Sequence, residues 1–260
     1  MHVPVVSAPW RARANERLAR VTLVWALGAL VIFGAHFVFG LAGFGVGLVA
    51  LAFLPYLMSP ADAIVLLTIY AAVFSAVLFV PLRRDWTPGA LAGLLVGYVL
   101  GTPVGVWVLA AAPASLLNRL IGAMLVIVVV LEFTGRLPKR VNGRWWSVVA
   151  GVLSGLLGGA VGLPGPPVIV YATASGWAPR TFKANVQAFF IVNQGIIVAG
   201  YAFAGLLTWN VLRLSAIYFV PALAGLAVGM SLFARVDPVR FRRLVFALLL
   251  VSGVLLLVTG

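Results

Sequence analysis

The sequence contains no cysteine and very little charge. Only 9% of its 260 residues are Asp, Glu, Lys or Arg, and only five of these are acidic. Without cysteine, the chain forms no disulfide, no thiolate nucleophile and no zinc–thiolate site. A water-soluble domain carries about 25% charged residues, so water is not the main solvent of this chain. With so few acids and a single histidine inside the apolar segments, we expect no metal site, no cofactor and no enzyme activity.

Long apolar runs dominate the composition instead. Hydrophobic residues make up 63% of the chain. They form runs of about 20 residues, the length of a membrane-spanning helix, that follow one another almost to the end. The runs are continuous rather than alternating, which favours helices over a β-barrel. The sequence therefore predicts an all-α polytopic membrane protein with about eight transmembrane segments.

The basic residues lie mainly between these runs and give the chain a net charge of +13. Membrane proteins carry such an excess in their cytoplasmic loops. We therefore interpret the charge as a topology signal and not as a nucleic-acid-binding surface. We expect a multi-pass protein of the cell (cytoplasmic) membrane, surrounded by the lipid bilayer.

The charged segments divide the chain into four parts. We expect a basic cytoplasmic arm at 1–20, a first transmembrane repeat at 21–134, a basic linker at 135–144 and a second transmembrane repeat at 145–260. Each repeat is predicted to contain four helices.

A glycine-rich segment occurs near the start of each repeat. The first long apolar segment has about 37 residues, or about 55 Å as a helix, which exceeds the bilayer core of about 30 Å. We therefore predict glycine-broken or re-entrant helices at the start of each repeat. In a transporter, paired breaks of this kind point to the substrate site. The glycines that recur at one constant offset are Gly40, Gly43 and Gly47 in the first copy and Gly155, Gly158 and Gly162 in the second.

A second block of glycines supports a duplication, because Gly101 and Gly105 match Gly225 and Gly229 at one offset. The relation between the two copies stays open. The first half is basic between its second and third helices and the second half between its third and fourth, which is expected of inverted repeats. Eight single crossings would instead place both termini on one side of the membrane.

The second glycine segment continues into prolines, which stop a helix and remove backbone N–H donors. Unwound backbone at membrane depth occurs where it lines a cavity, and the positive end of a broken helix attracts anions. We therefore predict that the backbone of both segments binds substrate, and that the second copy is the better equipped of the two. The backbone candidates are Gly43, Phe44, Gly45, Gly47, Gly158, Gly159, Gly162, Pro164 and Gly165.

Three features together resemble the TauE/SafE family of sulfite and organosulfonate exporters. They are the paired Gly-Leu-x-Gly segments, the proline-rich continuation and the turn into Pro-Arg-Thr-Phe-Lys-Ala-Asn185. The resemblance covers roughly residues 21–259. It implies a secondary transporter of a small sulfur-containing anion, such as sulfite or sulfoacetate, that exports its substrate with protons as the coupling ion.

Polar residues are unusually frequent in the segment that follows Pro179. In a membrane helix such side chains face the bundle interior, where cations bind oxyanions and amides supply neutral donors. The alternatives are snorkelling to the headgroups for Arg180 and hydrogen bonding between helices for the amides. The side-chain candidates for substrate binding are Arg180, Lys183, Asn185, Gln187, Asn193 and Gln194.

His36 is the candidate for proton coupling, because it is the only side chain in the first long segment that titrates near neutral pH. A histidine hydrogen-bonded between helices is the alternative. The same scaffold is compatible with an anion uptake permease or channel, since direction and coupling are not legible in the sequence. The sequence has no P-loop motif, so it does not predict ATP-driven transport.

Overall fold

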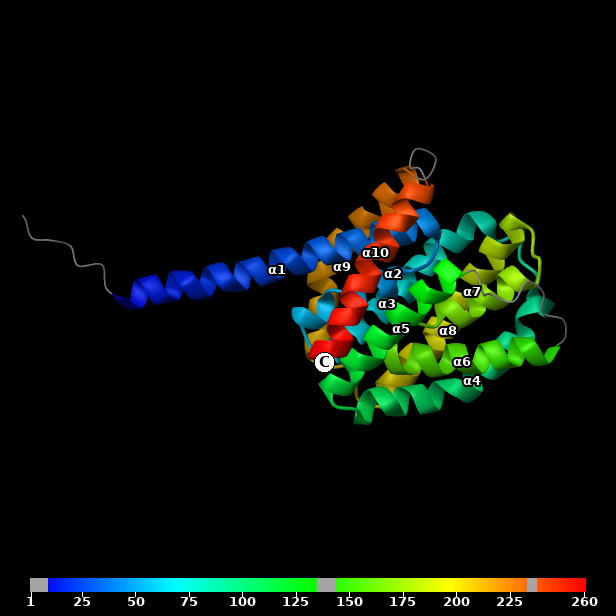
Figure 1. Cartoon of the computed structure of the whole chain (residues 1–260), viewed down its shortest axis with the longest axis horizontal. Coiled ribbons are helices and arrows are strands. Elements are labelled where there is room, and N and C mark those ends of the chain that lie inside the picture. The colour runs from blue at the N-terminus through cyan, green and yellow to red at the C-terminus, as the bar shows by residue number, and fades with distance from the viewer. Residues whose placement is uncertain (1–8, 135–143, 233–237) are drawn as a thin grey trace, which may run out of the picture.

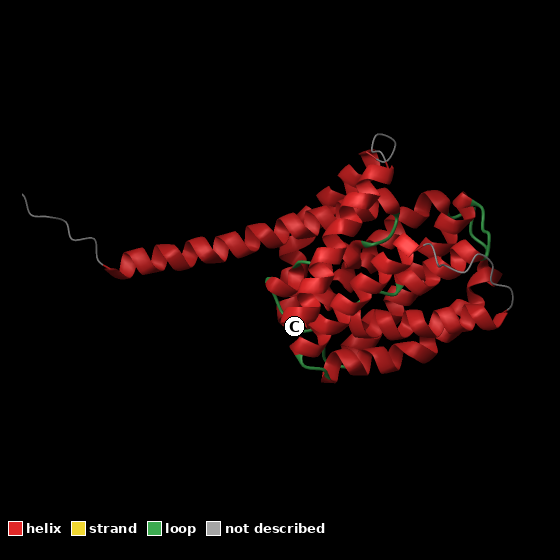
Figure 2. Cartoon of the chain, in the orientation of Figure 1, coloured by secondary structure: helices red, strands yellow, loops and turns green. Residues whose placement is uncertain are grey.

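The computed structural model describes residues 9–134, 144–232 and 238–260, and these are helical apart from short connections (Figure 2). The described residues exclude the first eight residues of the expected arm. They also exclude the expected linker at 135–144, apart from its last residue, Arg144. In chain order the helices are α1 (Pro9–Ala42), α2 (Val46–Leu51), the 3-10 turn η1 (Leu54–Tyr56), α3 (Pro60–Phe79), the 3-10 turn η2 (Val80–Leu82), α4 (Pro88–Ala111), α5 (Ala114–Thr134), α6 (Arg144–Val161), α7 (Gly165–Ala174), α8 (Pro179–Phe203), α9 (Trp209–Leu232) and α10 (Pro238–Thr259).

The helices confirm the prediction of an all-α polytopic membrane protein. Within the described residues, six helices are long and apolar enough to cross a bilayer, and three shorter helical segments are also apolar. The exact number of spans, expected to be about eight, stays a prediction. The six long segments are Thr22–Ala42, Pro60–Leu82, Pro88–Ala111, Ala114–Leu131, Pro179–Phe203 and Trp209–Leu232.

Both long apolar segments are broken at their glycines, as predicted. The first break separates α1 from α2, and the second separates α6 from α7. The backbone has left-handed φ angles at Gly43 (78°), Gly45 (90°) and Gly162 (67°), a region that glycine enters without steric cost. The chain therefore turns sharply at these points instead of continuing as one helix.

Two helix pairs pack closely in parallel, α4 with α6 and α1 with α9, and α4 and α6 lie side by side in Figure 1. Gly97 and Gly101 of α4 face the carbonyl oxygens of Val148 and Val152 in α6. A side chain at either glycine would collide with that backbone. Small residues thus allow the two helices to approach closely, as in small-xxx-small membrane interfaces.

The same contacts occur in the second pair. Gly225 and Gly229 of α9 face the carbonyl oxygens of Phe33 and Phe37 in α1. By these contacts, Gly225 and Gly229 are equivalent to Gly97 and Gly101. The sequence offset instead pairs them with Gly101 and Gly105, a pair that lies one helical turn further along α4.

The pairs α5–α10 and α3–α8 run antiparallel. Near the start of α5, the Nε of Arg119 donates to the carbonyl oxygen of Gly260 after α10 (3.1 Å). At the other end of this pair, the rings of Phe133 and Phe246 lie 6.2 Å apart. Near the start of α8, the Oδ1 of Asn185 accepts a hydrogen bond from the N–H of Thr87, which caps the start of α4 after the short connection from the end of α3 (2.7 Å).

These contacts define two ends of the bundle. At one end, Asn210 at the start of α9 donates to Asp62 at the start of α3 (3.1 Å), and the rings of Trp25 and Tyr218 lie 5.5 Å apart. We name this the terminal end, because α1 enters the bundle there, projecting outward in Figure 1, and α10 finishes there. We name the opposite end the linker end, because α5 finishes and α6 begins there.

Candidate functional site

The two glycine breaks meet inside the bundle. A methyl group added to Gly47, in the first turn of α2, would lie 3.1 Å from the carbonyl oxygen of Gly162 and 2.7 Å from the side chain of Leu163. Gly47 is buried, and Leu163 is 3% exposed. The structure therefore brings the two copies of the glycine segment together, as expected if both contribute to one site.

The first break leaves backbone groups outside any helix. The first hydrogen bond across α2 runs from the N–H of Val49 to the carbonyl of Gly45 (3.1 Å), so the N–H groups just before Val49 take no part in it. The Gly43 carbonyl accepts a hydrogen bond from Nε2 of Gln187 in α8. Phe44, between the two left-handed glycines, packs against an apolar cluster formed by α4, α6, α7 and α8.

The second break is more fully tied to the protein. The Tyr201 hydroxyl of α8 lies 3.1 Å and 3.0 Å from the carbonyl oxygens of Gly158 and Gly159, and donates its one proton to this pair. The Ser154 hydroxyl donates to the Pro164 carbonyl (2.6 Å).

Prolines also reduce the donors at this second break. Pro164, Pro166 and Pro167 surround the start of α7 and have no N–H. The expectation that the second copy is the better equipped for an anion therefore does not follow from its backbone, because the first break has more uncommitted donors.

The four amide side chains predicted from the sequence all lie buried in α8. Asn185 ties α8 to the start of α4, and Gln187 ties it to the first break. Asn193 is 0% exposed, and neither its Nδ2 nor its Oδ1 has a hydrogen-bond partner among the described residues. Gln194 is 5% exposed. The cluster thus combines structural hydrogen bonds with polar atoms that remain available.

Arg180, one of the two cations predicted at the start of α8, lies outside this buried cluster. Arg180 is paired with Asp85 at the linker end, with Nε and Oδ2 3.0 Å apart, and the Arg180 side chain is 74% exposed. Lys183, one turn further along, is partly buried. Arg180 therefore occupies the rim of the bundle, where the snorkelling alternative had placed it.

His36 is fully buried in an aromatic environment. Its Nδ1 donates to the Ile32 carbonyl (2.8 Å), and its ring makes edge contacts with Tyr70 and Phe74 at 5.3 Å each. Its Nε2 has no partner among the described residues. None of these neighbours belongs to either break, so the structure does not place the proton candidate beside the candidate substrate groups.

Two buried tyrosines at the second break were not predicted. Tyr201 and Tyr98 are both 0% exposed. Tyr201 continues the helical stripe that starts with Gln187 and Gln194, at intervals of seven residues, so that spacing was a usable signal. Tyr98 of α4 carried no such signal, because its role depends on which helix packs beside it. Its hydroxyl lies 3.1 Å from the position of a Cβ on Gly158 and has no hydrogen-bond partner among the described residues.

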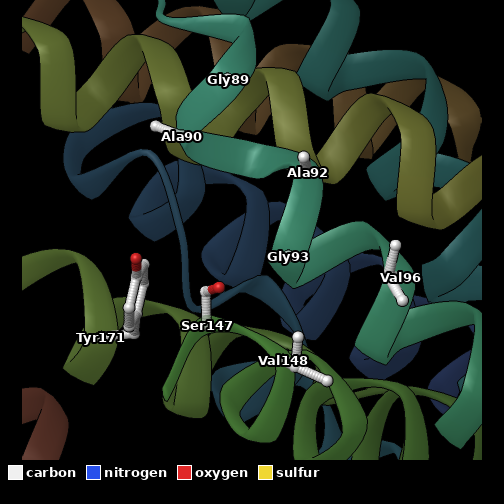
Figure 3. A pocket seen from close by; sticks show the side chains of 8 residues that line it. All are labelled: Gly89, Ala90, Ala92, Gly93, Val96, Ser147, Val148 and Tyr171. Carbon is white, nitrogen blue, oxygen red and sulfur yellow. The ribbon is translucent and has the colours of Figure 1, made fainter. Parts of the chain in front are cut away.

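A cavity of about 480 Å³ opens towards the linker end, between the starts of α4 and α6 and the helix α7. Figure 3 shows its small α4 residues facing Ser147, Val148 and Tyr171, and the Tyr171 ring points across the space towards the start of α4. None of the predicted site residues lines it. The α4 residues that line it are Gly89, Ala90, Ala92, Gly93 and Val96.

Comparison with known proteins gives one match. The family model described as "Sulfite exporter TauE/SafE" matches residues 27–256, which is nearly the whole chain. No curated protein and no solved structure matches it.

Proposed function

The chain belongs to the TauE/SafE family of sulfite exporters, and on this premise we propose that it is a secondary transporter. It exports sulfite or a small organosulfonate, such as sulfoacetate, across the cytoplasmic membrane, and the proton gradient drives the export. One observation carries the proposal. The two helix breaks meet beside a helix with buried amides, so unwound backbone and neutral donors converge at one place inside the bundle.

The chemistry of this place favours a small anion. Its side chains include neutral amides, which stabilise an oxyanion by donating hydrogen bonds to it. The acidic side chains that the structure describes, Asp62 and Asp85, lie at the two ends of the bundle and not beside the breaks. An anion at the centre is therefore not repelled by either of the described carboxylates.

Substrate binding then requires the backbone segments and α8 to act together. The candidates are Gly43, Phe44, Gly45 and Gly47 at the first break, Gly158, Gly159, Gly162, Pro164 and Gly165 at the second, and Asn185, Gln187, Asn193 and Gln194 in α8. In this proposal Lys183 and Arg180 attract the anion at the linker end, at increasing distance from the centre. Charge on the approach raises the local substrate concentration and the rate of encounter.

His36 is the proposed coupling group. It is the only described histidine, its Nε2 is available, and it sits in α1, two helical turns before the first break. A change in the protonation of His36 would alter the packing of α1 against Tyr70 and Phe74, and α1 leads directly into Gly43. Proton binding and the first break are thus connected through one helix.

Purified protein in proteoliposomes tests the proposal. We expect radiolabelled sulfite or sulfoacetate to move with an imposed pH gradient, and the movement to stop when a protonophore removes the gradient. Lys183→Ala and Asn185→Ala should reduce the rate. His36→Gln should leave exchange of labelled for unlabelled anion intact while abolishing accumulation driven by the gradient.

The outcomes separate the alternatives. Rapid flux that ignores the pH gradient in the wild-type protein would instead support an anion channel or permease. Movement of simple carboxylates with no movement of sulfur anions would overturn the substrate assignment. Unchanged transport in both Lys183→Ala and Asn185→Ala would remove these residues from the site.

A further inference from the structure

Tyr98 and Asn193 are buried residues whose polar side-chain atoms take no part in the hydrogen bonds of the described residues. Both are 0% exposed, and the Tyr98 hydroxyl and both amide atoms of Asn193 lack hydrogen-bond partners among the described residues. Thr102, one turn along α4 from Tyr98, donates its own hydroxyl proton to the Tyr98 backbone carbonyl (2.7 Å). Leaving a buried polar group unpaired costs free energy, so such groups in a membrane interior are candidates for binding a ligand.

The two residues belong to helices that pack against each other, α4 and α8. The rings of Tyr98 and Phe189 are 5.6 Å apart, and a side chain at Gly200 would lie 3.2 Å from Val106 of α4. Asn193 is one turn after Phe189 and two turns before Gly200, so all three share the face of α8 that lies against α4. Asn193 thus sits between two contacts with α4.

We propose that the Tyr98 hydroxyl and the Asn193 amide N–H donate hydrogen bonds to the –SO₃ group of the substrate, a role that rests on the transport function proposed above. The Tyr98 hydroxyl reaches the second break at Gly158, so this pair completes the binding place that the first break begins. Both groups are neutral donors, and hydrogen bonds to a charged acceptor are stronger than those between neutral groups.

Two measurements on purified protein test the role of Tyr98 and Asn193. Calorimetry gives the affinities for sulfite and sulfoacetate, and thermal unfolding gives the melting temperature. Tyr98→Phe and Asn193→Leu should each weaken both affinities at least about tenfold, with a melting temperature equal to or above that of the wild type, because each removes an unpaired group. Tyr70→Phe is the matched control, because the Tyr70 hydroxyl donates to the Ser215 carbonyl (2.6 Å). It should lower the melting temperature and leave both affinities unchanged.

Each contrary result has its own meaning. Wild-type affinities in both variants would overturn the assignment of Tyr98 and Asn193, as would a fall in melting temperature with the affinities unchanged. A wild-type protein that binds neither anion would instead overturn the proposed transport function.

A second inference concerns the direction of the two halves in the membrane, and it is carried by different observations. The first half enters the bundle at the terminal end and leaves it at the linker end, while the second half begins at the linker end and finishes at the terminal end. Equivalent helices also make equivalent contacts: Gly40 of α1 faces the Leu226 carbonyl of α9, as Gly155 of α6 faces the Tyr98 carbonyl of α4. We infer that the halves are inverted repeats.

The charges then assign the two ends to the two sides of the membrane. Twelve of the eighteen Lys and Arg residues lie in, or directly after, connections that join helices at the linker end. They are Arg83, Arg84, Arg136, Lys139, Arg140, Arg144, Arg180, Lys183, Arg235, Arg240, Arg242 and Arg243.

The other six basic residues belong to the terminal end, four of them in the arm before the first span. Because the excess of Lys and Arg marks the cytoplasmic side, and charges late in the chain can reverse the preference of a first helix, we infer that the linker end faces the cytoplasm. Both termini then face outward, opposite to the cytoplasmic arm expected from the first helix alone. An exporter oriented in this way presents its basic end to a cytoplasmic anion.

The absence of cysteine makes a direct test possible. Ala178 and Ala204 are exposed residues at the two ends of α8 and offer a matched pair for single cysteines. On intact cells, a membrane-impermeant maleimide should label Ala204→Cys but not Ala178→Cys, and a permeant maleimide should label both. The reverse pattern would overturn the orientation. Labelling of both sites or of neither by the impermeant reagent would overturn the assignment of α8 as a helix that crosses between the two sides.

Discussion

The two glycine breaks have similar sequences but are held in different ways. At the second break, three prolines fix the backbone, Ser154 holds the Pro164 carbonyl and Tyr201 holds the carbonyls of Gly158 and Gly159. At the first break, the side-chain hydrogen bond that the described part of the chain gives to the backbone comes from Gln187, and two left-handed glycines, Gly43 and Gly45, replace the prolines.

This difference assigns the two copies different tasks. A backbone fixed by proline and several hydrogen bonds is a rigid wall, whereas a backbone turned by glycines and held by one side chain can rearrange when a ligand competes for it. The first break is therefore the part of the site that we expect to move during transport. We expect the second to provide the fixed surface against which it moves.

The largest effect should come from separating the two breaks. Gly47→Val places a branched side chain against Leu163 and the Gly162 carbonyl, and overpacking of this kind costs about 1–3 kcal/mol. We expect transport in proteoliposomes to fall by more than about tenfold, because displaced breaks weaken substrate binding, and a loss of about 1.4 kcal/mol in binding free energy already corresponds to a factor of ten. Gly34→Val is the control, since a side chain at Gly34 would have no atom within 4 Å. Equal transport by the two variants would show that the breaks do not need to touch.

The first break should lose its shape without Gln187. Gln187→Leu leaves the Gly43 carbonyl buried without its partner, and such a loss costs about 1–3 kcal/mol. Denaturant unfolding of the purified protein should show that cost, together with a weaker affinity for sulfite. Unchanged stability with unchanged affinity would mean that the first break is held by its glycine geometry alone.

The breaks themselves were predictable from the sequence, and their partners were not. A segment of about 37 apolar residues is longer than a bilayer can hold as one straight helix, and glycine marks where it turns. The polar face of α8 was also readable, because amides recur along it. Tyr98, by contrast, lies in a plain apolar run, and its importance comes from the packing of α4 against α6 and α8. The equivalence of Gly225 with Gly97 also depends on helix packing. The sequence offset pairs Gly225 with Gly101, one helical turn away, because glycine spacing alone leaves the register of a helix pair ambiguous.

The glycines with left-handed backbone should differ between the breaks. At Gly45, alanine meets almost open space, with the nearest atom at 4.0 Å, so Gly45→Ala measures the conformational strain of about 1–2 kcal/mol alone. At Gly162, alanine also approaches Ile64 of α3 at 3.1 Å, so Gly162→Ala should cost more. Unfolding free energies of the two variants give the comparison directly. A larger cost at Gly45 would contradict the more tightly packed second break.

The smallest effect should follow loss of the Tyr201 hydroxyl. In Tyr201→Phe the Gly158 carbonyl keeps its bond from the Gly162 N–H (3.0 Å), while the prolines and Ser154 still fix the backbone. The Gly159 carbonyl loses its side-chain donor, so we expect a loss of about 1 kcal/mol in unfolding free energy, the low end of the cost of an unpaired buried group, and transport within about twofold of the wild type. Because Gln187→Leu and Tyr201→Phe each remove one hydrogen bond from α8 to a break, measuring both in one preparation isolates the difference between the copies. If Tyr201→Phe reduced transport as much as Gln187→Leu, the second break would also have to move, and the two copies would be equivalent halves of the mechanism.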